Sequence, residues 1–400
     1  MKILIALILA LTIVTNDGTV KSDEYPKAPT VERAETYTGQ TFELALITSF
    51  GTVYDMSYNQ RAWEGLEKYA KERNISHKYY QPEGFDNYSY LSAIDQAVMC
   101  GAKVIVAPGF LLEVPVYLAQ DLYPDVKFIL VDGNPHNEDY SIFHTADNTV
   151  GITFAVEEAG FLAGYAAVLE GMKGFGFFGG MAVPEVVRFG YGYIQGVEYA
   201  AQELVFADDS LTLNYLYTGG FSATPKAQEI ATSLYFKSKI DVIFACGGAV
   251  VKSVIAAAKK TDKKVIGVDI DQSFESPTVI TSAIKELGNS VYDCISGYYD
   301  GKFPGGQNII FSAKDNGVGL PMETSRFEKF SKADYDAIYA KLKDGSIKLL
   351  LDTDAYDNQI NIDDIPLKAV KLQYYLNSYK YNYDIGELEA IFSYYADDMN

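Results

Sequence analysis

The chain has 400 residues, of which 48% are hydrophobic. At roughly 150 residues per domain, this length and composition favour two lobes over one large core. Its 33 basic and 53 acidic side chains give a net charge of −20. Such a charge repels phosphate backbones and anionic lipid surfaces, so we expect no nucleic-acid partner.

The beginning of the chain predicts export. Met1 and Lys2 supply a short positive start, and residues 3–14 form an apolar run of signal-peptide length that is too short to span a bilayer. The stretch that follows is polar and has no apolar period. We therefore interpret residues 1–40 as a signal peptide and linker; a buried amino-terminal strand or helix is the alternative.

An alternation of strands and helices follows. Apolar runs at 42–47, 77–81, 104–107, 128–131 and 142–144 are strand-like, and residues 58–73 have helical spacing of their apolar side chains. Amphipathic segments lie between the strands. This alternation is typical of a parallel, doubly wound α/β sheet.

A second series of the same kind begins near Gly151. Helices are predicted over 155–169, 190–203, 224–236 and 250–259, and strands at 174–178, 211–217, 242–245 and 265–268. Short strands at 278–282 and 308–311 are expected to cross back to the first lobe and to complete a hinge of several strands. We assign 41–148 plus about 275–312 to lobe 1, and 149–274 plus about 313–350 to lobe 2.

The last part of the chain has a different character. It is charged and rich in tyrosine, with an amphipathic helix predicted over 334–343. Residues 351–400 are acidic with alternating tyrosines. We interpret this extension as a solvated cap or edge on one lobe.

Cysteine usage gives no sign of disulfides or metal. Cys100, Cys246 and Cys294 are an odd number, and apolar or small residues flank each of them. They are interpreted as small buried packing residues. The chain has no CxxC motif and its three histidines are isolated, so we expect no metal site and no cofactor.

Two charged residues stand at predicted strand ends. Asp269 follows a buried apolar run, and Lys285 follows a second short extended run, at the edge where an open α/β sheet presents a crevice. A carboxylate beside an ammonium group makes charge-assisted hydrogen bonds to vicinal hydroxyls such as those of ribose. An Asp at a strand end is otherwise a cap or a surface charge. Gly248 follows another strand and allows a ligand to approach the backbone, or it forms a plain turn.

Seven runs in order resemble the basic membrane protein family of substrate-binding lipoproteins. They cover most of residues 42–321: 55–60 with 64–65, 158–164, 179–181, 188–189 with 196–197, 267–272, 281–282 with 285, and 300–306. The resemblance implies the type I periplasmic-binding-protein fold, with a doubly wound, mostly parallel sheet in each of two lobes. It also implies a nucleoside ligand and an ABC importer as the partner that receives it.

The resemblance assigns ligand contacts in both lobes. Tyr58 and Phe189 match the positions that hold a planar base between two aromatic rings, although each is otherwise an ordinary core aromatic. Asp132 matches a carboxylate that faces the base. Asp55 and Asn59 flank Tyr58 and either hold the loop or touch the ligand.

The chain departs from the family at two points. Ser49 stands where the family commonly has an acidic residue that we expect to read the base, which puts the purine preference in question. No cysteine follows the apolar run at 3–14. Export to the periplasm or the outer face of the cell membrane is expected; a lipid anchor is not implied, and a soluble exported form and a signal segment retained in the membrane both stay open.

Other classes of protein fit the sequence less well. A nucleoside hydrolase would need a metal or an activated nucleophile, and no motif for either occurs. A repressor of the same fold would need a basic helix-turn-helix ahead of the first lobe. A sensor that reports ligand to a membrane receptor stays open. We therefore expect a monomeric, non-enzymatic binding protein that captures a nucleoside, with a purine as the expected base, and delivers it to an ABC permease.

Overall fold

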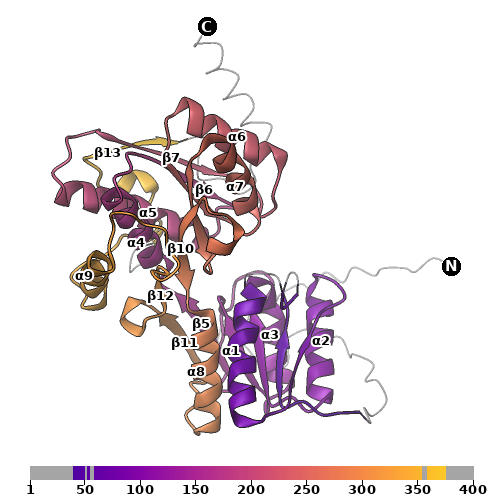
Figure 1. Cartoon of the computed structure of the whole chain (residues 1–400). Helices are drawn as coiled ribbons and strands as arrows, with labels where there is room; N and C mark the ends of the chain where they lie inside the picture. The colour runs from indigo at the N-terminus through magenta and orange to yellow at the C-terminus, as the bar shows by residue number, and fades with distance from the viewer. Residues whose placement is uncertain (1–38, 50–51, 55–57, 354–357, 375–400) are drawn as a thin grey trace, which may run out of the picture. The chain divides into compact units, whose positions relative to one another are not determined.

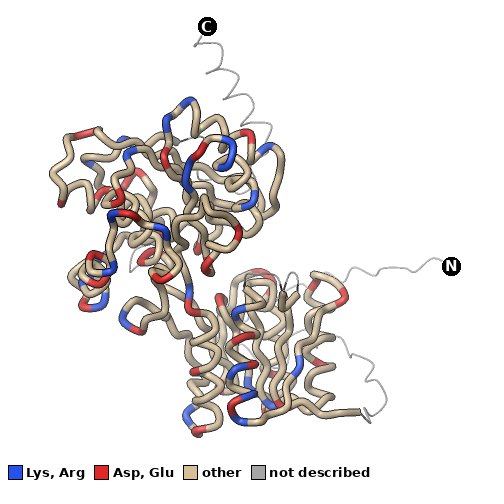
Figure 2. Tube along the Cα trace, in the orientation of Figure 1, with Lys and Arg blue, Asp and Glu red and all other residues tan. Residues whose placement is uncertain are grey.

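The computed structural model describes residues 39–49, 52–54, 58–353 and 358–374 (Figure 1). The expected signal peptide, Asp55 of the candidate site and the last residues of the acidic extension lie outside the described residues. Acidic and basic residues are interspersed over the helices and loops of the described chain (Figure 2).

The first sheet has six strands in the order β11-β5-β4-β3-β1-β2, and every neighbouring pair is parallel. Its strands are β1 (Leu44–Ile47), β2 (His77–Tyr80), β3 (Val104–Pro108), β4 (Lys127–Val131), β5 (Thr149–Phe154) and β11 (Gln307–Phe311). The side chains of β1, β3 and most of β4 are completely buried. Continuous apolar runs of this kind belong to strands that helices cover on both faces.

Helices cover the two faces of this sheet in pairs. Leu44 and Leu46 pack in one core with α1 (Tyr58–Arg73) and α8 (Leu287–Tyr299). Ala45 and Ile47 pack in a separate core with α2 (Asn87–Met99) and α3 (Glu113–Leu122). Successive side chains of a strand point to opposite faces, so β1 serves both cores. Figure 1 shows α1 beside α8 along this sheet.

The second sheet has seven strands in the order β12-β10-β9-β8-β6-β7-β13. All pairs are parallel except β10 with β12. Its strands are β6 (Gly174–Gly179), β7 (Leu211–Tyr217), β8 (Val242–Cys246), β9 (Lys264–Asp269), β10 (Val279–Lys285), β12 (Val318–Gly319) and β13 (Val370–Tyr374). Phe177 faces the core of α4 (Val156–Leu169) and α5 (Pro184–Glu203), and Phe178 faces α6 (Pro225–Lys237) and α7 (Val250–Thr261). Helix α9 (Lys332–Lys343) follows β12.

Glycines bring the backbones of α4 and α5 into contact. A Cβ atom on Gly160 would lie 2.1 Å from the carbonyl oxygen of Phe189, and one on Gly192 would lie 1.9 Å from that of Glu157. Gly164 and Gly196 make equally close approaches further along the two helices. The glycine-rich run at 158–164 is therefore a helix-packing motif, since no larger residue permits this separation.

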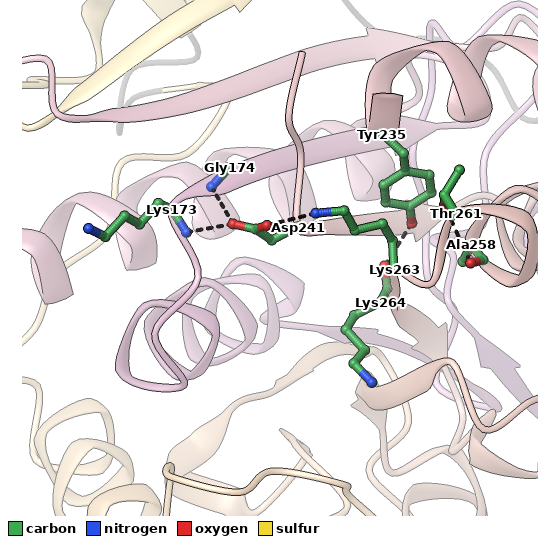
Figure 3. Close-up of polar contacts among 8 residues, drawn as sticks. All are labelled: Lys173, Gly174, Tyr235, Asp241, Ala258, Thr261, Lys263 and Lys264. Carbon is green, nitrogen blue, oxygen red and sulfur yellow. Dashed lines mark hydrogen bonds and ion pairs between the residues drawn. The ribbon is translucent and has the colours of Figure 1, made fainter. Parts of the chain in front are cut away.

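Hydrogen bonds and an ion pair of Asp241 link neighbouring strands at the amino-terminal edge of the second sheet. Asp241, just before β8, accepts hydrogen bonds from the backbone of Lys173 at 3.0 Å and of Gly174 at 3.1 Å, and its second oxygen lies 3.0 Å from Lys263 Nζ (Figure 3). These bonds join the starts of β6, β8 and β9. They lie at the opposite ends of the strands from Asp269, the last residue of β9.

Several boundaries differ from the sequence-based expectations. Helix α5 begins at Pro184, earlier than predicted, because proline is well suited to a first helical position. The strand expected at 142–144 is only an isolated bridge between Phe143 and His136, since β5 rather than this segment pairs with β4. Strand β5, assigned above to lobe 2, is hydrogen-bonded in the first sheet, and β10, assigned to lobe 1, pairs with β9 in the second. The three cysteines are free and buried, as predicted.

Candidate functional site

Lys285 joins the carboxyl ends of strands from both sheets. It is the last residue of β10, and 3% of its side chain is exposed. Its Nζ atom contacts Asp132 Oδ2, just after β4, and lies 3.0 Å from Asp269 Oδ1, at the end of β9. The structure therefore brings together three predicted site residues that are far apart in the sequence.

Two aromatic rings flank the same ammonium group. Lys285 Nζ lies 4.7 Å from the ring centroid of Tyr58 and 5.7 Å from that of Phe189. It also donates to the Tyr58 hydroxyl at 3.4 Å. Tyr58 begins α1 and is half-buried, while Phe189 lies in α5, is 1% exposed and packs edge-on against Phe244. Both predicted stacking residues are thus neighbours of the lysine, within the range of cation–π attraction.

Burial raises the pKa of Asp132 to about 7. Lys285 acts in the opposite direction, whereas Glu185 and Asp269 reinforce the rise. Burial would lower the pKa of Lys285, but the two aspartates outweigh it and raise that pKa above its usual range. The ammonium group therefore stays charged and is surrounded by more than one carboxyl group.

Asp132 has spare hydrogen-bonding capacity. Its side chain is 5% exposed, and one oxygen bonds to Lys285 while the other, Oδ1, is buried without a hydrogen-bond partner among the described residues. A buried acceptor without a donor costs roughly 1–3 kcal/mol. An O–H or N–H group of a ligand would satisfy Oδ1 and remove that cost.

Two glutamates near this cluster were not predicted from the sequence. Glu113 begins α3, accepts from the backbone N–H of Asn134 at 2.9 Å and lies 3.1 Å from His136 Nε2. Burial raises the pKa of Glu113. Glu185, in the first turn of α5, acts electrostatically on both Glu113 and Asp132. One sequence feature could have indicated them: each lies in the first turn of a helix that follows β3 or β6, near the carboxyl end of that strand.

Asn59 and Ser49 hold the connection after β1. The backbone N–H of Ser49 donates to Asn59 Oδ1 at 2.8 Å, and the side chain of Asn59 is completely buried. Of the two roles predicted for Asn59, holding the loop is the one these contacts favour. A Cβ atom on Gly109 would lie 3.2 Å from Ser49 Oγ, so Ser49 lies beside the end of β3. Contacts of Ser49 and Asn59 with a ligand stay predictions.

Gly248 lies in a turn after β8. Its φ is 52°, a left-handed conformation that favours glycine. A Cβ atom there would lie 3.2 Å from the carbonyl oxygen of Phe221, whereas the described contacts do not connect Gly248 to Lys285. The left-handed turn explains why a glycine stands at position 248. The close approach of its backbone to a ligand stays a prediction.

A cavity of about 510 Å³ adjoins Lys285 from the side of α1 and α8. Arg61 and Lys68 of α1, Asn289 and Tyr292 of α8, and Asp271 are among the residues that line it. Asp132, Asp269, Tyr58 and Phe189 are not among its described lining residues. We therefore place the candidate site at the two aspartates and the two rings, because two aromatic faces and two carboxylates meet at Lys285 there, whereas Tyr292 is the single aromatic residue among the described lining of the cavity.

Two mostly parallel α/β sheets, with a charged cluster at the carboxyl ends of their strands, define a solute-binding protein of the type I periplasmic class. Solved structures support this fold. The chain matches an ABC transporter solute-binding protein from Aeropyrum pernix K1 with a TM-score of 0.64 at 22% identity, covering 79% of this chain and 95% of the other. A solute-binding protein from Conexibacter woesei matches with the same TM-score and identity, over 78% and 99% of the two chains.

The chain belongs to the family described as ABC transporter substrate-binding protein PnrA-like, whose model matches residues 42–350. It is 32% identical to the ABC transporter nucleoside-binding protein BmpA of Lactococcus lactis, over 74% of this chain and 87% of that protein. It is 31% identical to basic membrane protein B of Borreliella burgdorferi, over 68% and 78%.

Family membership settles the class of function. The protein is an extracytoplasmic substrate-binding component of an ABC transporter, with a small-molecule ligand and a permease as partner, and it is not an enzyme. Within the described ranges, no three or more His, Cys, Asp or Glu side chains are grouped to hold a metal ion. No helix in the described part of the chain is long and apolar enough to cross a membrane.

Proposed function

We propose that this protein binds a nucleoside at the Lys285 cluster and delivers it to an ABC importer. The observation that carries the proposal is the buried Asp132–Lys285–Asp269 group between the rings of Tyr58 and Phe189. A nucleoside joins a flat aromatic base to a polyhydroxylated sugar, and the cluster offers aromatic faces together with charged hydrogen-bonding groups. The name of the Lactococcus relative is consistent with this ligand.

Each part of the ligand has a complementary part of the site. The rings of Tyr58 and Phe189 stack on the base, which contributes on the order of 1–3 kcal/mol per base. Asp269 and Lys285 bind the ribose hydroxyls through charge-assisted hydrogen bonds. The free oxygen of Asp132 accepts from an N–H group of the base.

The proposal includes the organisation of the whole protein. Each sheet with its helices forms one lobe, the ligand lies between the carboxyl ends of their strands, and the protein acts as a monomer outside the cytoplasm. Residues 1–40 direct export.

Calorimetric titration of the purified protein with inosine, ribose, hypoxanthine and inosine monophosphate tests the ligand class. We expect inosine to bind far more tightly than ribose or hypoxanthine, because only the nucleoside engages both halves of the site. We expect the monophosphate to bind weakly because several carboxyl groups repel its phosphate. Mass spectrometry of any co-purified ligand provides an independent check. Ribose that binds as tightly as inosine would overturn the proposal in favour of a sugar-binding protein.

A further inference from the structure

Part of the acidic extension runs along one face of α5. We call residues 350–353 and 358–370 the C-terminal strap; it begins where the match to the family model ends. The side chains of α5 that bond to it are Arg188, Tyr191, Gln195 and Glu198. Their spacing of three or four residues places all of them on the same side of the helix.

The strap is held at the beginning and in the middle of this face. Arg188 Nε donates to Asp352 Oδ1 at 2.6 Å. The side-chain amide of Gln195 donates to the carbonyl oxygen of Leu350 and accepts from its N–H, each at 2.9 Å. The Tyr191 hydroxyl donates to the backbone carbonyl of the strap at 3.1 Å. Backbone groups of the strap and the side chain of Asp352 thus provide hydrogen-bond partners for the polar side chains on this face of α5.

The end of the strap is fixed by a buried carboxylate. Glu198 is 4% exposed and accepts hydrogen bonds from the backbone N–H groups of Lys368, Ala369 and Val370 at 3.0–3.1 Å. The chain then continues as β13, which pairs in parallel with β7 at the edge of the second sheet. The strap is therefore a component of this sheet and its helix layer.

The first two turns of α5 carry Glu185 and Phe189, and the start of this helix has no side-chain cap. Glu185 and Phe189 act on the Asp132–Lys285 pair, yet no side chain caps the helix at Val183. An uncapped first turn leaves backbone N–H groups without intrahelical partners and tends to fray. The glycine contacts with α4 hold one side of α5, and the Arg188–Asp352 pair holds the face that meets the strap.

Asp352 is matched to Arg188 by charge as well as by geometry. Glu157 of α4 also acts on Arg188, but burial raises the pKa of Glu157 to about 7. Below neutral pH, Glu157 is therefore largely neutral, and Asp352 is the carboxylate bonded directly to the guanidinium group.

We infer that the C-terminal strap is a positioning element of the ligand site, in which Asp352 fixes Arg188 and thereby the first two turns of α5, which carry Glu185 and Phe189. The strap touches no ligand itself. Its contribution to affinity rests on the proposed nucleoside function, whereas its effect on α5 does not.

The test compares Asp352→Asn with Asp241→Asn in the full-length protein. Asp241 pairs with Lys263 at the amino-terminal edge of the same sheet (Figure 3). Both ion pairs are partly exposed: the exposed fraction of the side chain is 38% for Asp241 and 29% for Lys263, against 18% for Asp352 and 34% for Arg188. We expect Asp352→Asn to raise the Kd for inosine about tenfold. Asp241→Asn should leave that Kd unchanged even if it lowers the unfolding midpoint, and Asp352→Glu should restore much of the lost affinity.

Hydrogen exchange of residues 184–190, measured without ligand, gives a second readout. Asp352→Asn should speed amide exchange in these first two turns, and Asp241→Asn should not. Unchanged exchange would overturn the inference, as would an unchanged Kd in a wild-type protein that binds inosine. A wild-type protein that binds no nucleoside would instead refute the proposed function, and the exchange data would still decide the role of the strap.

Discussion

Asp132 and Asp269 occupy equivalent places in two different sheets. Each stands at the carboxyl end of a parallel strand, and each has a left-handed backbone, with φ of 59° and 66° respectively. Asp tolerates this conformation better than most residues because its short side chain bonds locally. Both side chains contact Lys285. Lys285 thus forms ion pairs with an aspartate at the end of a strand in each sheet. A ligand that enters the site must compete with these ion pairs for Asp132, Asp269 and Lys285.

The first prediction concerns the carboxylate that we assign to the sugar. Asp269→Asn removes the negative charge and leaves the amide in its place, so both the ribose hydroxyls and Lys285 lose a charge-assisted partner. We expect inosine binding to weaken by about 2–4 kcal/mol. Calorimetry on the variant and the wild type measures this difference.

A neighbouring aspartate provides the control. Asp271 accepts from the backbone of Ser273 at 2.9 Å and from the Thr324 hydroxyl at 2.6 Å, so its two oxygens bond to residues other than Lys285. Asp271→Asn should therefore change affinity little. Equal affinities for wild type and Asp269→Asn would remove Asp269 from the site.

The second prediction is a dependence of binding on pH. Asp132 has a pKa of about 7, raised from the ordinary range of a carboxylic acid, so it takes up a proton as the pH falls through 7. If a base N–H donates to the ionised form alone, Kd should rise about tenfold for each pH unit below 7. Calorimetry from pH 8 to pH 5.5 measures this slope.

A variant separates Asp132 from the charged groups around it. Lys285, Asp269 and Glu185 act on Asp132, and the Glu113–His136 pair lies on the adjacent segment. Asp132→Asn should bind more weakly at pH 8 and lose most of the slope. A slope that persists in Asp132→Asn would show that Asp132 does not set the pH dependence.

The same raised pKa has a consequence for stability without ligand. The folded protein holds the proton of Asp132 more tightly than the unfolded chain, whose aspartates have pKa values near 4. Its contribution to stability is therefore present at acidic pH and is lost as the pH rises from about 4 towards 7.

The sequence predicts the sheets better than it predicts the site. Buried strands such as β3 are continuous apolar runs, and their periodicity is visible without a structure. Asp269 and Lys285 were predicted because charged residues directly after such runs lie at a sheet edge, and Asp132 was assigned by the resemblance to the family. Glu113 and Glu185 were missed because acidic residues in a first helical turn are common for reasons of the helix dipole alone.

Connections between distant segments could not be predicted in the same way. Glu198 accepts from backbone N–H groups about 170 positions later in the chain. Backbone N–H groups carry no sequence signature, and an acidic, tyrosine-rich segment gives no apolar period for a strand. No pattern in the sequence therefore predicted the edge strand β13. The sheet membership of β5 and β10 depended on strand pairing, which a single sequence does not specify.

The third prediction tests the contact between α4 and α5. A Cβ atom on Gly192 would lie 1.9 Å from the backbone carbonyl of Glu157, so Gly192→Ala must push the helices apart. Overpacking of this kind costs about 1–3 kcal/mol of unfolding free energy, and urea unfolding measures it. Gly220→Ala is the matched control, because nothing lies within 4 Å of a Cβ atom there. Equal losses in both variants would show that the two helices separate without strain.

The last prediction concerns selectivity and starts from Ser49. Its side chain lies beside the end of β3, at the position where the family commonly has an acidic residue. A hydroxyl both donates and accepts, whereas a carboxylate only accepts, so the wild-type protein lacks a charge-assisted bond to a purine ring N–H at this point. We expect a flat preference among bases in the wild type, and we expect Ser49→Asp to favour guanosine and inosine. Ser49→Asn has nearly the shape of the aspartate without its charge, and it should not sharpen the preference. Competition among guanosine, inosine, adenosine, uridine and cytidine measures all three proteins. A wild type that already prefers 6-oxopurines strongly, with no change in Ser49→Asp, would show that another group reads the base; Asp132, with its free buried oxygen, is then the carboxylate to substitute next.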